Sequence, residues 1–458
     1  METNNKREFT RRKFLKTTVV GSAGLLSPKL FVGQERSPGA ETVEVLNPEN
    51  KVPLSFIIDD STCLVNMAYY GIPQFHAAFP DRYPQDWRRL PREIPDAFVR
   101  EFGEWCRDHG VKGKYSIVPY PACVGWVDRF LPGWSAQELS ESLALVRDFM
   151  SEDWDIHPEM ISHTRVIDIY TGRPYQEASP EYMENWGWSQ DKSAEVLTEY
   201  MAYALRILRN AGLYCEGITT PGGFGSQNRE NLALGTREAV REVYNVDVPH
   251  YFRDLFTDPE QSVQPRVKLA EDLDSDDPKC VVSIIGCTGD WFGGWDGLTP
   301  GSVDRFITED LQKGRLVEVI DQEEPAILVC HWPGIYYNGE KTGFNIFKEV
   351  VGRVHAKYEN VLWMKLSEIA RYWAAKELTS ITRDGDTIAL NAPFATGRFT
   401  LRTTGRLSGA PTVQTEGESV PLTEARSLSA LQSGSWYAEN ENLFLCFDLS
   451  RGTTRITL

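Results

Sequence analysis

Stretches of strand character alternate with amphipathic stretches along most of the chain. Apolar runs predict buried strands at residues 54–58, 114–118, 155–163, 214–220, 280–286, 326–330 and 360–365. Apolar residues at helical spacing predict helices at residues 94–110, 135–150, 191–212, 228–245, 303–320, 344–358 and 366–378. Strands that alternate with helices in this way form parallel sheets.

Seven or eight such β–α units favour a closed barrel over an open doubly wound sheet. No glycine-rich GxGxxG sequence follows the first strand, so the pattern lacks a dinucleotide-binding fingerprint. Near Thr379 the composition changes to Thr, Ser, Gly and Arg, with short strand-like pieces. We therefore expect an α/β protein with a barrel at residues 50–376 and a small antiparallel β-domain at residues 379–458.

The first 40 residues have a separate character. The segment "TRRKFLK" places Arg11 and Arg12 ahead of apolar residues, and the weakly apolar "TTVVGSAGLL" follows it. This segment is too short and too polar to span a bilayer. It resembles a twin-arginine export signal, with removal expected between residues 33 and 40. The resemblance implies the twin-arginine export machinery as a partner and a bacterial protein located in the periplasm or outside the cell.

The charge balance limits the possible partners. The formal net charge is −17, although the first 33 residues carry seven Lys/Arg and only two Glu. The remaining chain is therefore strongly acidic, which argues against nucleic acid and anionic membranes as partners. No later segment predicts a stable membrane span. The eight cysteines include no CxxC pair, and we interpret most of them as small buried hydrophobic residues.

Polar residues stand at the ends of several predicted strands. The first strand ends in two adjacent carboxylates, Asp59 and Asp60, which is costly unless a metal ion, a basic partner or open solvent is near. Two of the seven histidines, His163 and His331, also end strands. Because the carboxyl ends of parallel strands meet at one mouth of a barrel, we expect these four residues to lie together there.

The third predicted strand offers further candidate ligands. Side chains alternate along a strand, so His157, Glu159 and His163 are expected on one face. Imidazoles and carboxylates are common zinc ligands. For His163 we favour a role as metal ligand. For His157 and Glu159 we favour a buried hydrogen-bonded pair near the barrel floor.

The order of these motifs resembles the polysaccharide deacetylase family of the glycoside hydrolase/deacetylase superfamily. The resemblance rests on the Asp–Asp pair, "SHT" after the third strand, "PGGF" later and a histidine on a late strand, and it covers roughly residues 50–376. It implies an irregular (β/α)7-type barrel and a divalent metal cofactor, expected to be zinc. It also implies that Asp59 is the general base, that Asp60 and His163 bind the metal, and that His331 is the general acid.

The chain departs from the family pattern at two positions. The family has a second histidine four residues after the first, where this chain has Ile167; His157 or Asp168 is a possible third ligand instead. The family's Arg–x–Pro motif falls near "TTPGG", where Thr219 stands at the arginine position.

Aromatic residues follow the late strands, at Trp291, Trp295, Trp332 and Tyr336. Flat aromatic faces at the barrel mouth would bind a sugar ring, and ordinary loop packing is an equally good interpretation.

Three hypotheses follow for the function. The first is an exported, metal-dependent carbohydrate hydrolase, most simply a polysaccharide deacetylase. The second is a glycosidase on the same barrel that uses paired carboxylates near Asp59 and Asp290. The third is a non-catalytic carbohydrate-binding or scaffold protein on a decayed deacetylase barrel.

Overall fold

The computed structural model describes residues 43–458 with the exception of 406, 408 and 416, and these residues belong to one compact unit. The twin-arginine segment lies outside the described residues, so the export signal stays a prediction. The eight cysteines are free, and all except the half-buried Cys123 are buried. Within the described part of the chain, no helix is long and apolar enough to cross a membrane.

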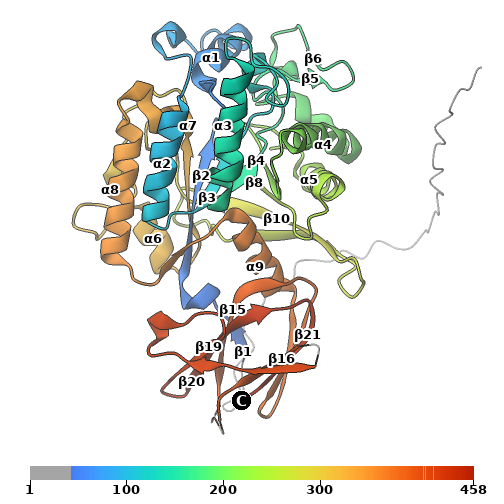
Figure 1. Ribbon diagram of the computed structural model, residues 1–458, viewed down its shortest axis with the longest axis vertical. Coiled ribbons are helices and arrows are strands. Elements are labelled where there is room, and N and C mark those ends of the chain that lie inside the picture. Colours follow the sequence, from blue (N-terminus) through green and yellow to red (C-terminus); the bar gives the residue numbers. More distant parts are fainter. Residues whose placement is uncertain (1–42, 406, 408, 416) are drawn as a thin grey trace, which may run out of the picture. The chain divides into compact units, whose positions relative to one another are not determined.

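Two mainly parallel sheets form the larger part of the molecule (Figure 1). In the first sheet the strand order is β11-β2-β3-β4, and β12 also pairs with β2. In the second sheet the order is β7-β8-β10-β9, and only β9 is antiparallel to its neighbour. The strands of the first sheet are β2 (Val52–Asp59), β3 (Gly113–Ser116), β4 (Trp154–His157), β11 (Ala326–His331) and β12 (Val361–Trp363). Those of the second are β7 (Gly217–Thr219), β8 (His250–Leu255), β9 (Arg266–Glu271) and β10 (Lys279–Gly286).

The backbone hydrogen bonds between the two sheets are isolated and do not form continuous ladders. At one junction Glu159 forms an isolated parallel bridge with Thr219, whose N–H donates to the carbonyl of Pro158 at 3.0 Å. At the other, the N–H of Cys287 donates to the carbonyl of Ile327 at 2.8 Å. The fold is therefore mixed α/β, and closure into a seven-stranded barrel stays a prediction.

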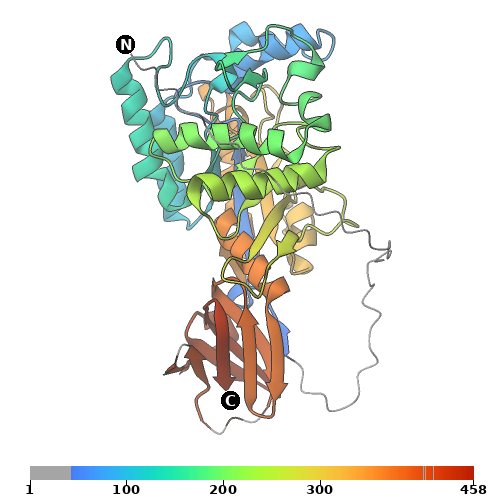
Figure 2. The same ribbon diagram turned by 90° about the vertical axis from the view of Figure 1, so that its right-hand side faces the viewer.

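Helices connect the strands and cover the sheets, as both views show (Figures 1 and 2). Ser135 illustrates how the sequence starts one of them: its side chain accepts from the N–H of Glu138, whose carboxylate accepts from the N–H of Ser135. The helices are α1 (Met67–Ala78), α2 (Asp96–Asp108), α3 (Ala136–Asp148), α4 (Ala194–Asn210), α5 (Arg229–Tyr244), α6 (Arg315–Asp321), α7 (Trp332–Tyr336), α8 (Thr342–Lys357) and α9 (Leu366–Leu378).

The third predicted strand and the helix predicted before the late strands are both much shorter than expected. The strand predicted at residues 155–163 ends at His157, because Pro158 has no N–H and Met160 and His163 take positive φ angles of 51° and 63°. His163 therefore lies in a loop after β4, not on the strand. The helix predicted at residues 303–320 begins only at Arg315, with a 3-10 turn (Val303–Arg305) before it.

The C-terminal residues from Ser380 onward form two five-stranded sheets that share a hydrophobic core. One sheet has the order β1-β15-β20-β19-β18 and includes the N-terminal strand β1 (Val43–Val45); the other has the order β13-β14-β21-β16-β17. The remaining bounds are β13 (Ser380–Asp384), β14 (Thr387–Ala392), β15 (Thr396–Thr404), β16 (Thr412–Thr415), β17 (Glu418–Pro421), β18 (Thr423–Glu424), β19 (Ser435–Glu439), β20 (Asn442–Leu449) and β21 (Gly452–Thr457). Two short strands, β5 (Ile167–Asp168) and β6 (Arg173–Pro174), form a separate hairpin.

Candidate active site

The two carboxylates at the end of β2 are both buried but have different surroundings. Asp59 is the last residue of β2 and lies opposite His331 in the register of β2 and β11. Asp60 follows with a φ angle of 57°, so the chain turns sharply between the two side chains. They are 6% and 3% exposed, which requires a partner for each negative charge.

The partner of Asp59 is Lys114 on β3, whose side chain is fully buried. The Lys114 ammonium donates to the Asp59 carboxylate, to the carbonyl of Ile58 at 2.9 Å and to Ser116 Oγ at 2.7 Å. Burial raises the pKa of Asp59 and the charge of Lys114 opposes that rise, leaving the pKa of Asp59 at about 6. Lys114 thus favours the ionised, proton-accepting form of Asp59 near neutral pH.

Asp60 belongs to a cluster with Glu159 and His163. His163 Nε2 lies 2.6 Å from Asp60 Oδ1 and 3.2 Å from Glu159 Oε1, and Glu159 Oε2 accepts from the N–H of Asp60 at 2.8 Å. Burial disfavours the charged forms, but the mutual attraction of these groups outweighs it. It lowers the pKa of Glu159 to about 2 and raises the pKa of His163 well above its usual value.

This cluster fits a divalent metal ion. One ligand atom from each of Asp60, Glu159 and His163 lies within 4.8 Å of the other two. Asp60 Oδ1 is buried and faces His163 Nε2 at 2.6 Å. Two carboxylates and one imidazole are a normal ligand set for zinc.

The loop that carries His163 is held by a buried carboxylate. Glu184 accepts from the N–H groups of Ile161 at 3.2 Å, Ser162 at 3.1 Å and His163 at 2.6 Å, and from the hydroxyl of Tyr200 at 2.5 Å. Burial raises the pKa of Glu184 to about 7, although these hydrogen bonds oppose the rise. Glu184 therefore fixes a loop with two positive φ angles, in which His163 could not otherwise keep its orientation.

His331 forms the third pair of the site. Its Nδ1 lies 2.8 Å from Asp290 Oδ2. Burial disfavours the imidazolium, but the hydrogen bond to Asp290 and the negative charges of Asp60 and Asp59 outweigh it and raise the pKa of His331 to about 10. His331 is therefore protonated at neutral pH, with Nε2–H left to donate.

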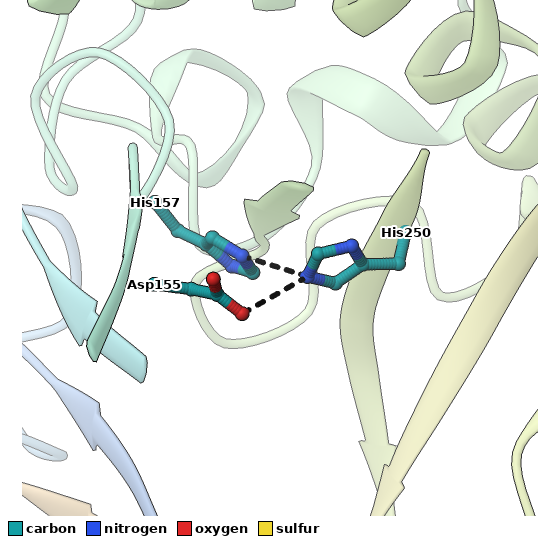
Figure 3. A group of neighbouring side chains, drawn as sticks. All are labelled: Asp155, His157 and His250. Carbon is teal, nitrogen blue, oxygen red and sulfur yellow. Dashed lines mark hydrogen bonds and ion pairs between the residues drawn. The ribbon is translucent and has the colours of Figure 1, made fainter. Parts of the chain in front are cut away.

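The structure does not bring the two possible third ligands to this cluster. Asp168 lies on β5, and its carboxylate accepts from the N–H of Tyr170 at 2.9 Å. His157 contacts His250 on β8 (Figure 3), so the expected pair of His157 with Glu159 is wrong. Glu159 is the third residue of the cluster instead. The backbone turns after Pro158, and the Glu159 carboxylate then lies beside both Asp60 and His163.

The residues that complete the site differ in how far local sequence patterns indicate them. Glu159 stands four residues before His163, and the side-chain alternation already placed the two on one face. Lys114 is a charged residue near the start of a short buried strand, and a lysine is almost never fully buried without a partner. For Glu184 no local pattern indicates a role, since only the fold brings it to the His163 loop.

The four aromatic residues have different environments. Trp332 is fully buried against Phe98, Phe102 and Tyr115, so its predicted role in substrate binding is wrong. Its apolar surroundings hold it in the core because α7 begins at this residue and turns its ring inward.

The other three aromatic residues keep part of their surface. Trp291 packs on Phe306, and Tyr336 packs on Phe98. Trp295 is half-buried and lies 5.9 Å from Phe75 between ring centres, and Phe75 lies 6.3 Å from His163. Of the predicted aromatic residues, Trp295 is therefore connected to the candidate metal cluster through a single intervening ring.

Comparisons with known proteins found similar solved structures but no matching family model and no matching curated protein. A protein of Pseudomonas aeruginosa PAO1 described as a probable polysaccharide deacetylase is 12% identical, with a TM-score of 0.37, over 71% of this chain and 91% of that one. Puue allantoinase is 13% identical, with a TM-score of 0.36, over 72% and 91%. A glycoside hydrolase/deacetylase structure from Parabacteroides distasonis is 10% identical, with a TM-score of 0.39, over 78% and 82%.

Proposed function

We propose that this protein is a metal-dependent carbohydrate hydrolase that removes acyl groups, most simply acetyl groups, from a polysaccharide. The observation that carries the proposal is the cluster of Asp60, Glu159 and His163 directly beside a carboxylate paired with a lysine. The order of the motifs along the sequence, which resembles the polysaccharide deacetylase family, supports the same reaction.

Asp60, Glu159 and His163 would hold the metal ion. A divalent ion bound there supplies Lewis-acid polarisation of a carbonyl oxygen and increases the acidity of water. To act as a ligand, His163 would have to lose the proton on Nε2, the nitrogen that faces both carboxylates.

Asp59 and His331 are suited to move protons on the two sides of the reaction. Asp59 is the general base, because Lys114 holds its carboxylate in one orientation and keeps it ionised at neutral pH. His331 is the general acid, because Asp290 fixes its Nδ1 and keeps the imidazole protonated, so that Nε2–H donates to the leaving group. The two residues are neighbours on adjacent parallel strands, within reach of one substrate group.

The experiment compares three variants for bound zinc and for acetate released from acetylated oligosaccharides. Asp60→Asn is expected to lose the metal, because an amide oxygen is a weaker, uncharged ligand. Asp59→Asn is expected to keep the metal and lose roughly 100- to 10,000-fold in kcat, the usual contribution of a general base. Asp168→Asn, at a half-buried carboxylate of the β5–β6 hairpin, is the matched control and keeps both.

Two results would contradict the proposal. Equal metal content in the wild type and Asp60→Asn removes the metal assignment. A metal-loaded wild type that releases no acetate from any acetylated sugar excludes the deacetylase and leaves a glycosidase or a binding protein.

We also propose export by the twin-arginine machinery, on the strength of Arg11 and Arg12. Replacement of both with Lys is expected to retain the protein in the cytoplasm, as cell fractionation would measure. Unchanged delivery to the periplasm would refute it.

A further inference from the structure

Three buried side chains lie close together inside the fold, at residues of β4 that precede Glu159 and His163 and at the start of β8. Asp155 and His157 come from β4, and His250 is the first residue of β8 (Figure 3). His157 Nε2 lies 3.0 Å from His250 Nε2, and Asp155 Oδ2 lies 4.0 Å from the same nitrogen of His250. One ligand atom of each residue lies within 4.8 Å of the other two.

The spacing of these atoms suits a metal ion. Two nitrogens bound to zinc at about 2.0–2.1 Å in tetrahedral geometry lie roughly 3.3 Å apart, close to the distance between the two imidazoles. The Asp155 oxygen, which lies 4.0 Å from His250 Nε2, needs to move by roughly 0.7 Å to reach the same separation. Two imidazoles and one carboxylate are also a common zinc ligand set.

Neighbouring residues orient Asp155 and His157, as the neighbours of metal ligands do. Asp155 accepts from the N–H of Ser367 at 2.6 Å and from Ser367 Oγ at 2.9 Å. His157 Nδ1 lies 3.3 Å from Thr219 Oγ1, so Nε2 is the nitrogen that faces His250 and would bind an ion. The polar contacts of the His250 ring all lie within the cluster, since its Nδ1 is buried and makes no hydrogen bond with the described residues.

The position of the cluster gives an ion a structural role. β4 belongs to the first sheet and β8 to the second, and on this side the sheets are joined mainly by the isolated bridge of Glu159 with Thr219. Gly217 lies against the two imidazoles, where any Cβ would come within 2.6 Å of His250 Nε2 and 2.7 Å of His157 Nε2. The chain therefore keeps a side chain away from both nitrogens at the junction of the sheets.

A cavity borders one residue of the cluster. Asp155 and Ser367 line this cavity of about 360 Å³, together with Glu216 and Arg371. His157 and His250 are fully buried behind it and do not line it.

We propose that Asp155, His157 and His250 bind a second divalent metal ion of the zinc type, which cross-links the two sheets. This site is separate from the cluster of Asp60, Glu159 and His163 and takes no part in the proposed reaction. Because an ion that binds only the folded chain stabilises it, zinc bound here raises the unfolding temperature.

The test counts zinc ions per chain by elemental analysis, after the full-length protein has been stripped with a chelator, reloaded with zinc and desalted. The wild type is expected to hold two ions, His250→Gln one and Asp60→Asn one. Added zinc is expected to raise the unfolding temperature of Asp60→Asn, which keeps only the site of Asp155, His157 and His250. His109→Gln, which removes a surface imidazole stacked on Trp105, is the matched control and keeps two ions.

The outcomes separate this inference from the proposed function. One ion in the wild type that is lost in Asp60→Asn and kept in His250→Gln overturns the second site and leaves the proposed active site intact. One ion with the opposite dependence supports the second site and removes the metal from the proposed reaction. A wild type without zinc overturns both.

A measurement on the wild type covers the case in which His250→Gln does not fold. Anomalous diffraction at the zinc edge from zinc-soaked crystals is expected to show a peak between His157 and His250. A peak only at Asp60 and His163, or no peak, overturns the second site. Asp155→Asn, which keeps the size of the side chain, gives an independent variant with the same expected loss of one ion.

Discussion

Adjacent carboxylates on one strand are compensated by two different partners. Asp59 is paired with the buried ammonium of Lys114, and Asp60 faces His163. Regular strand geometry would send the two side chains to opposite faces of the sheet. The positive φ angle of Asp60 departs from that geometry, and it directs the two carboxylates to different partners. The neighbouring residues can therefore have different chemical functions, one as base and one as metal ligand.

Lys114→Met is expected to destabilise the protein by about 3–5 kcal/mol, because it leaves the buried carboxylate of Asp59 without its partner. The double variant Lys114→Met/Asp59→Asn is expected to recover part of that loss, since the unpaired charge is then gone. Urea unfolding followed by circular dichroism measures both. Equal stabilities of Lys114→Met and the wild type would show that the ion pair does not stabilise the fold.

Asp290→Asn is expected to shift the alkaline limb of the kcat–pH profile to lower pH by about 1–3 units. His331 must be protonated to act as an acid, and its pKa near 10 depends on the hydrogen bond and charge of Asp290. For the same reason, the pairing stabilises the fold fully below pH 6.5 and ceases to do so as the pH rises through about 10. An unchanged alkaline limb would remove His331 as the general acid.

At the scale of elements, the loop after β4 decides the geometry of the candidate metal cluster. The strand stops at His157, and the next residues turn sharply enough to carry Glu159 and His163 to the side of Asp60. Glu184, in the segment before α4, supplies the acceptors that the N–H groups of this turn require. The buried Glu184 carboxylate therefore compensates for the strained backbone of the loop, whose N–H groups donate to it.

Glu184→Ala is expected to weaken zinc binding at the active site about 10- to 100-fold, the usual effect of removing a group that orients a ligand. Glu184→Gln keeps one carbonyl acceptor and is expected to lose less. Titration with a zinc-sensitive dye measures the affinity. Tyr200→Phe, which removes only the hydroxyl that donates to Glu184, is the control and keeps most of the affinity.

At the scale of the whole molecule, one hydrophobic core extends from the parallel strands through α9 into the C-terminal sheets. Ile57 of β2, Trp373 of α9 and Phe399 of β15 belong to the same buried cluster. The hydroxyl of Tyr372 on α9 also donates to the carbonyl of Leu46 at 2.8 Å, next to β1. The C-terminal sheets are therefore not an independent attachment.

Unfolding is expected to follow a single cooperative transition in which near-ultraviolet and far-ultraviolet circular dichroism coincide. Trp373→Ala is expected to lower the stability of the whole protein by about 3–5 kcal/mol, because it empties part of the shared core. Two separate transitions, only one of which Trp373→Ala shifts, would show that the C-terminal sheets unfold independently.

The sequence by itself determined the alternation of strands and helices, the strand character of the C-terminal part and the position of Asp59, Asp60 and His331 at strand ends. These features depend on hydrophobic periodicity and on composition, which are local properties. The alternation expected for residues 155–163 also grouped Glu159 with His163, although the two meet through a loop after β4 and not along a strand.

Only the tertiary structure decided the partners. His157 and His250 are 93 residues apart and meet because β4 and β8 lie in different sheets at one junction. Lys114 lies 55 residues from Asp59, and Glu184 lies 21 residues from His163, so these contacts too are non-local. The inward turn of Trp332 depends on the packing of α7 against Phe98 and Phe102. Which charges and imidazoles meet is a property of long-range packing, and no local pattern in the chain contains it.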